Sequence, residues 1–139
     1  METLYETEDN DGEIRKILLQ LLIENNTNKV GTAAIDRSII YLKDADEGKV
    51  SGGIWAEALF DWMYIEIVYV PENKRGQGIG SQLVARVEQI AKSKGCVGVW
   101  LETFQFQAPE FYMKKGYEIF ATLKDYPKGY TRFFLKKVF

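Results

Sequence analysis

The sequence of 139 residues contains no histidine and only one cysteine, Cys96. The absence of histidine excludes a histidine general base, a serine–histidine catalytic pair and a histidine-ligated metal ion. A single cysteine cannot form an internal disulfide, which suits a reducing compartment, and it cannot build a thiolate zinc site. We therefore predict that the protein binds no metal.

Strong charge and long hydrophobic runs are also missing. The formal net charge is -2, which gives no indication of nucleic acid or an anionic membrane as a partner. There is no apolar run long enough to span a membrane and no basic-then-apolar signal segment at the start. We expect a cytoplasmic protein that binds neither membranes nor nucleic acid, and the length predicts a single domain over residues 1–139.

A glycine-rich turn is the most informative stretch that is present. Glycine occupies every second position of Arg75-Gly-Gln-Gly-Ile-Gly80, between an apolar run, Tyr64–Val70, and a helical run, Ser81–Lys94. Because glycine has no side chain, the backbone N–H groups of such a turn stay uncovered, and they lead into a helix N-terminus that favours an anion. We predict a phosphate site here, to which Arg75 and Lys74 can add charge-assisted hydrogen bonds.

The spacing of the glycines can be compared with the known phosphate-binding motifs. No Gly-Lys-Ser or Gly-Lys-Thr occurs, so the turn is not a P-loop. A dinucleotide fingerprint would need glycine where Ser81 or Leu83 stands, although Glu102 lies about where a ribose-binding acid would be. The pattern that remains is Arg75-x-x-Gly78-x-Gly80.

A second block lies further along the chain, in Ala108-Pro-Glu-Phe-Tyr-Met-Lys-Lys-Gly-Tyr117. The two blocks together resemble the signatures of the GNAT superfamily of acetyl-CoA-dependent N-acetyltransferases, and the resemblance covers roughly residues 54–137. The run Glu102–Ala108 and the ending that begins at Asp125 look like those of small bacterial GNAT proteins without an assigned substrate.

The resemblance and the hydrophobic periodicity give the expected fold. It is an α/β GNAT fold, a mixed and mostly antiparallel sheet of six or seven strands, with helices on both faces. The sheet is splayed between its fourth and fifth strands, at the cofactor site. Helices are expected over 12–26, 79–94 and 109–116, and strands over 35–43, 49–60, 62–70, 97–103, 117–123 and 130–138. Residues 1–10 form either a first edge strand or a frayed end.

The resemblance implies transfer of acetyl from acetyl-CoA to a primary amine of a small molecule or a protein, by direct attack in a ternary complex. It places the pyrophosphate of coenzyme A on the glycine turn and pantetheine on the preceding strand end. Gln105 stands where many family members have asparagine. The predicted cofactor-binding residues are Val68, Tyr69, Val70, Lys74, Arg75, Gly76, Gln77, Gly78, Ile79, Gly80, Ser81 and Gln105.

Two residues are candidates for catalysis. The resemblance places Tyr112 near the cofactor sulfur, where a phenol can protonate a departing thiolate. Strand alternation would put Glu66 on one face with residues 62, 64, 68 and 70, so that a partly desolvated carboxylate with a raised pKa could serve as general base. A solvated glutamate, with a water or no group as base, is the alternative.

Other questions stay open at this level. Trp55, Phe60 and Trp62 could line an acceptor pocket or belong to the sheet core. Alternative functions are an acyl-CoA-binding module without catalysis, a nucleotide-binding protein of another class, and a toxin–antitoxin or regulatory role through protein acetylation. Family members often form homodimers through their last strands. The sequence does not identify the amine, the range of acyl groups, the oligomeric state or the biological role.

Overall fold

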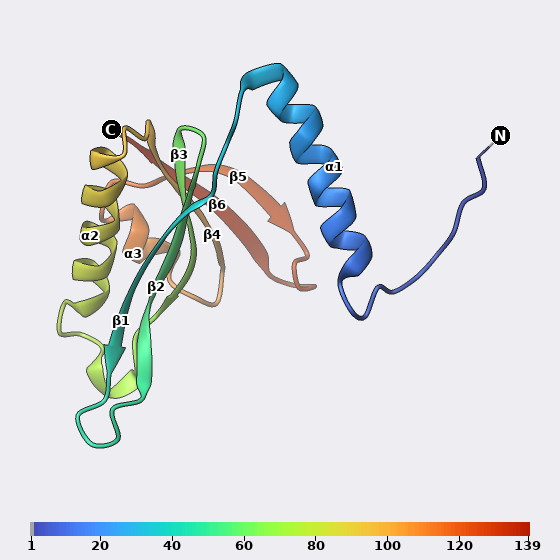
Figure 1. The fold of residues 1–139 in the computed structure, drawn as a ribbon. Coiled ribbons are helices and arrows are strands. Elements are labelled where there is room, and N and C mark those ends of the chain that lie inside the picture. The colour runs from blue at the N-terminus through green and yellow to red at the C-terminus, as the bar shows by residue number, and fades with distance from the viewer. Residues whose placement is uncertain (1) are drawn as a thin grey trace. The chain divides into compact units, whose positions relative to one another are not determined.

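The computed structural model describes residues 2–139, which divide into two compact units, one ending at Ala33 and the other running over Ala34–Phe139 (Figure 1). The first unit contains helix α1 (Glu13–Val30), which is longer than the sequence predicted. The Asp9 carboxylate accepts hydrogen bonds from the N–H groups of Ile14 and Arg15 and so caps the first turn. Residues 2–9 contain no strand, which excludes the predicted alternative of an edge strand there.

The second unit is built on a six-stranded mixed sheet in the order β1-β2-β3-β4-β6-β5. Only β3 and β4 run parallel, as expected for strands joined through a helix. The remaining neighbours are antiparallel, which confirms the predicted mixed sheet. The strands are β1 (Asp36–Lys43), β2 (Val50–Leu59), β3 (Trp62–Tyr69), β4 (Gly98–Phe104), β5 (Glu118–Lys124) and β6 (Thr131–Val138).

Two helices of this unit pack into one core. Helix α2 (Ile79–Ser93) follows β3 through a short 3-10 helix, η1 (Glu72–Lys74), and lies along one face of the sheet (Figure 1). Helix α3 (Pro109–Met113) contributes Tyr112 to the same cluster of buried side chains. The prediction of helices on both faces involves α1, which belongs to the other unit, and it stays a prediction.

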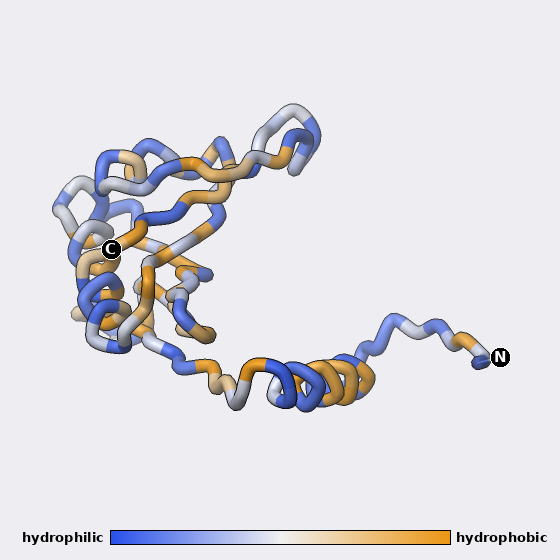
Figure 2. The backbone as a smooth tube through the Cα atoms, turned by 90° about the horizontal axis from the view of Figure 1, so that it is seen from above, coloured by the Kyte–Doolittle hydropathy of each residue, from blue (hydrophilic) through white to orange (hydrophobic). Residues whose placement is uncertain are grey.

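Hydrophobic and hydrophilic residues are interspersed along the backbone of this unit (Figure 2), and successive side chains of a strand point to opposite faces. The core face carries buried side chains such as Met63, Val99 and Leu135, packed on α2 and α3. The opposite face, called the second face below, carries Tyr64 and Trp100, whose rings stack with their centroids 4.3 Å apart.

A β-bulge interrupts β3 at Glu66. Trp55 of β2 pairs with Ile67 and Ala56 pairs with Ile65, so Glu66 is the extra residue. Beyond the bulge the alternation reverses, and Val68 packs against the core. The prediction that residues 62, 64, 66, 68 and 70 share one face was therefore wrong, because that rule holds only for an uninterrupted strand.

Strands β3 and β4 also diverge. Their parallel pairing covers only Trp62–Ile65 with Gly98–Leu101 and ends immediately before the bulge. This confirms the predicted splay. It lies between the third and fourth strands of the sheet, because no strand precedes β1 in residues 2–35.

We expect Leu135→Ala, which leaves a void under β6, to lower the free energy of unfolding by about 2–5 kcal/mol. The Leu135 side chain is fully buried, whereas Leu123 on the neighbouring β5 is exposed. Urea denaturation of both variants measures the difference. A Leu123→Ala variant that loses as much stability would contradict the placement of the core.

Candidate active site

A cavity of about 940 Å³ occupies the splay between β3 and β4. Its lining includes core-face residues such as Thr103 and Tyr112 and also second-face residues such as Glu66, Glu102 and Arg132. The cavity therefore passes through the sheet, with one end at the N-terminus of α2 and the other on the second face.

The first end is shaped to receive an anion. Gly76 and Gly78 have φ angles of 76° and 80°, which favour glycine because L side chains rarely adopt that region. The first hydrogen bond of α2 runs from the Gln82 N–H to the Gly78 carbonyl at 3.0 Å. The N–H groups of residues 79–81 therefore have no partner within the helix, and no side chain caps them.

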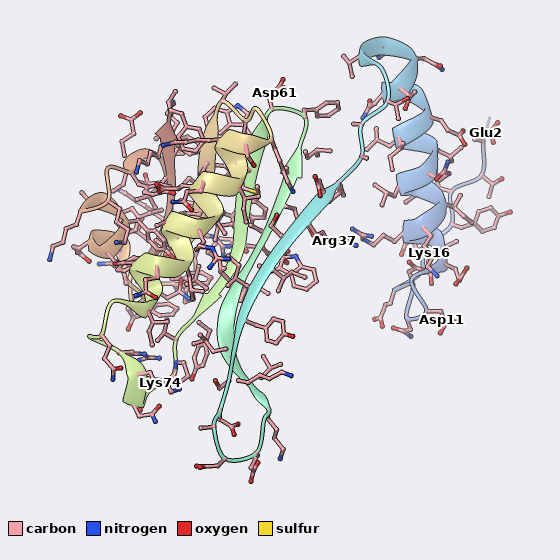
Figure 3. All side chains as sticks on the ribbon, turned by 60° about the vertical axis from the view of Figure 1, so that its left-hand side comes forward. Glu2, Asp11, Lys16, Arg37, Asp61 and Lys74 are labelled. Carbon is pink, nitrogen blue, oxygen red and sulfur yellow. The ribbon has the colours of Figure 1, made fainter. Side chains whose placement is uncertain are left out.

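Cationic side chains surround these N–H groups. Arg75 donates from Nε to the Val70 carbonyl at 2.9 Å, which ties the turn to the end of β3. Lys74 also lines the cavity, and Figure 3 shows it at the end of η1, in the segment that precedes α2. Lys115, which the sequence analysis did not select, donates from Nζ to Ser81 Oγ. Its only sequence signal is its place in the Lys-Lys-Gly run of the second motif.

The backbone groups of β3 that were predicted to bind pantetheine also lack partners on the β4 side of the sheet. After Ile65, β3 has β2 as its only neighbour, so backbone groups that point toward β4 are not used in the sheet. Most predicted site residues line the cavity, but Gln77 and Gln105 do not. Those that line it are Glu66, Val68, Tyr69, Val70, Lys74, Arg75, Gly76, Gly78, Ile79, Gly80, Ser81 and Tyr112.

Gln105 has a different set of partners. Its side-chain oxygen accepts the Thr131 N–H at 2.9 Å, and its own N–H donates to the Thr131 carbonyl at 2.9 Å. The glutamine that lines the cavity is Gln107, whose Oε1 accepts the Phe104 N–H at 2.8 Å. Gln105 thus joins the loop after β4 to β6, and its predicted contact with the cofactor stays a prediction.

Tyr112 is buried, with 8% of its surface exposed, yet it lines the cavity. Edge-to-face contacts with Phe111 and Tyr117 hold its ring. Burial disfavours the charged phenolate and raises the pKa of Tyr112 to about 12. The hydroxyl is therefore a proton donor throughout the physiological range.

Glu66 lies on the bulge with its side chain exposed. The expected desolvation of this carboxylate was wrong, since a bulged residue at the mouth of an open cavity stays in contact with water. Its negative charge still affects the pKa of the nearby Tyr64. The pKa of the Tyr64 hydroxyl is raised first by burial and then by the negative charges of Glu102 and Glu66.

An ion pair between Arg132 and Glu102 lines the cavity at its second-face end. The Arg132 guanidinium lies over the rings of Phe104 and Tyr126, 4.4 Å and 4.8 Å from their centroids. Phe104 stacks on Phe106, which also lines the cavity. Trp55, Phe60 and Trp62, for which the sequence left open either an acceptor pocket or the sheet core, do not line the cavity.

The comparisons with known proteins agree with this geometry. Residues 4–117 match the acetyltransferase (GNAT) family, and the chain belongs to that family. It is 39% identical over 93 residues to blasticidin-S acetyltransferase of Streptomyces morookaense, covering 66% of this chain and 68% of that protein. It is 29% identical over 129 residues to an acetyltransferase of Agrobacterium fabrum, covering 93% of both.

Solved structures show the same fold. A crystal structure of an acetyltransferase from Bacillus cereus has a TM-score of 0.79 and 33% identity and covers 100% of this chain and 98% of its own. A Bacillus anthracis protein assigned to streptothricin acetylation, solved with acetyl coenzyme A, has a TM-score of 0.60 and 25% identity over 67% of this chain and 58% of its own. Thialysine N-epsilon-acetyltransferase of Sus scrofa is 34% identical over 61 residues, or 44% of this chain and 32% of that protein. GNAT acetyltransferases use acetyl-CoA, and the features of the first end fit its phosphates.

None of the helices in residues 2–139 has the length and apolar character needed to cross a membrane. In the same range no group of three or more acidic or cysteine side chains is placed to hold a metal ion.

The raised pKa of Tyr112 predicts a pH dependence of stability. The folded-state pKa of about 12 exceeds the unfolded value of about 10, so the contribution is complete below pH 10 and is lost as the pH rises toward 12. Between pH 8 and pH 11 we expect the wild type to lose about 1.4 kcal/mol of unfolding free energy more than Tyr112→Phe. Urea denaturation at both pH values tests this, and equal losses would contradict a buried hydroxyl.

Proposed function

We propose that this acetyltransferase transfers acetyl from acetyl-CoA to a primary amine of a small molecule, by direct attack in a ternary complex. The observation that carries the proposal is the cavity through the splayed sheet, with an anion-binding helix N-terminus at one end and carboxylates at the other. Three similar proteins are named as acetyltransferases of blasticidin S, streptothricin and thialysine, and these names support a small-molecule amine as the acceptor.

Binding follows from the groups at the first end. The N–H groups of residues 78–81 would hold the pyrophosphate, with added charge from Lys74, Arg75 and Lys115. The backbone edge of β3 beyond Ile65 would pair with the pantetheine amides, as a strand would. When bound, acetyl-CoA supplies the activated acetyl group beside Tyr112.

Glu66 and Tyr112 carry the protons of this reaction. The ammonium form of the acceptor loses one proton to Glu66, directly or through a water, and becomes the neutral, nucleophilic amine. A carbon–nitrogen bond to the acetyl carbon forms, the carbon–sulfur bond breaks, and Tyr112 gives its proton to the sulfur. In the same step the nitrogen releases its second proton to the Tyr112 oxygen, which restores the hydroxyl, and Glu66 returns its proton to water.

The pKa of Tyr112 limits the order in which these protons can move. A thiol ionises near pH ~8.5, well below the pKa of about 12 for Tyr112, so a lasting phenolate would be unfavourable. Tyr112 must recover a proton as it gives one, and it acts as a relay between the nitrogen and the sulfur.

We expect Tyr112→Phe to lower kcat by about 10²- to 10⁴-fold, the usual contribution of one positioned acid, with little change in acetyl-CoA affinity. Steady-state kinetics with an accepted amine, together with calorimetry, separate the two quantities. An unchanged kcat would remove Tyr112 from the mechanism.

Acetyl-CoA binding is tested with Ser81→Glu. A glutamate in the first turn favours the helix itself but sets a carboxylate against the cofactor phosphates. We expect at least ~10-fold weaker binding by calorimetry, with Ser93→Glu at the other end of α2 as a folded control of equal charge. Failure of the wild type to bind would end the proposal. Binding without acetylation of any amine would instead favour an acyl-CoA-binding module.

A further inference from the structure

The ion pair between Arg132 and Glu102 joins two strands and also lies in the wall of the cavity. Glu102 and Arg132 lie diagonally across the β4–β6 pair, on the second face, and both line the cavity. Their side chains are 21% and 20% exposed, so the pair is neither solvated on the surface nor sealed in the core.

Arg132 keeps binding capacity beyond this pair. A guanidinium has five N–H groups, and in residues 2–139 Arg132 donates one hydrogen bond, from Nη2 to Glu102. The rings of Phe104 and Tyr126 hold its position from the side. A guanidinium held in this way is prepared for a bidentate contact with a carboxylate.

Glu102 has matching capacity for a cation. An ionised carboxylate accepts about four hydrogen bonds, and the bond from Arg132 accounts for one of them. An ammonium group could therefore bind Glu102 while a carboxylate binds Arg132. The zwitterionic head of an α-amino acid carries an ammonium group and a carboxylate on one carbon, and so it matches these two neighbouring charges.

We propose that Arg132 and Glu102 bind the α-carboxylate and the α-ammonium group of the acceptor, which is a diamino acid acetylated on its side-chain amine. The inference rests on the proposed function. The apolar stem of the acceptor would pass along Phe104 and Phe106, and its distal amine would reach Glu66 and Tyr112 through the splay.

Three amines of similar length test this assignment. L-lysine carries both head groups, cadaverine lacks the carboxylate and 6-aminohexanoate lacks the α-ammonium group. For the wild type we expect kcat/KM for lysine to exceed that for either analogue by about 10- to 100-fold, mostly through KM, because each analogue leaves a charged group unpaired. Equal or better use of cadaverine would overturn the proposal without any variant.

Two variants assign the two contacts. Arg132→Gln should remove the preference for lysine over cadaverine, and Glu102→Gln should remove the preference for lysine over 6-aminohexanoate. Lys136→Gln is the matched control, since Lys136 lies on the same face of β6 but pairs with Glu118 outside the cavity. Preferences that persist in both variants would mean that the ion pair only joins β4 to β6.

Calorimetry separates this proposal from the proposed function. Lysine is titrated into protein saturated with coenzyme A, with cadaverine as the comparison. Lysine binding that depends on Arg132, without turnover, would uphold the recognition site and overturn the transfer reaction. Turnover of amines with no preference for lysine would do the reverse.

Discussion

The site depends on one constraint, the end of pairing between β3 and β4 after Ile65. A continuous parallel sheet would close the space between these strands and satisfy their backbone groups with each other. The bulge at Glu66 adds a residue to β3 at the point where the strands diverge. It turns Val68 toward the core, leaves Glu66 at the cavity mouth and leaves one edge of β3 available to a ligand.

The splay also gives the cavity two chemically different ends. On the core face, helix α2 begins with free N–H groups, and Arg75 and Lys115 hold the elements around them in place. On the second face, the Glu102 carboxylate and two aromatic rings contact the guanidinium of Arg132. A polyanionic cofactor and a cationic amine would therefore approach from opposite sides and meet beside Tyr112, which is the arrangement that direct transfer requires.

The sequence was sufficient to predict the order of elements and to select the glycine-rich turn as a phosphate site. Glycine spacing and helix signals are local, so the turn could be recognised from the sequence, whereas Tyr112 was selected through the resemblance to the GNAT family. The second face could not be assigned, because its residues come together only through pairing of β4 with β6. The bulge was missed because the β-branched and aromatic run of β3 gives no local sign of an extra residue, and the face of Glu66 was misjudged with it. Phe106 and Arg132 lie in the two runs that resemble small bacterial GNAT proteins, but that resemblance gave neither residue a role.

A crystal structure of the protein with acetyl-CoA would show whether the splay between β3 and β4 is the cofactor site. We expect pyrophosphate oxygens within hydrogen-bond distance of the N–H groups of residues 78–81, pantetheine along β3 beyond Ile65, and the sulfur beside the Tyr112 hydroxyl. Acetyl-CoA bound outside the splay, or with its sulfur far from Tyr112, would contradict this expectation.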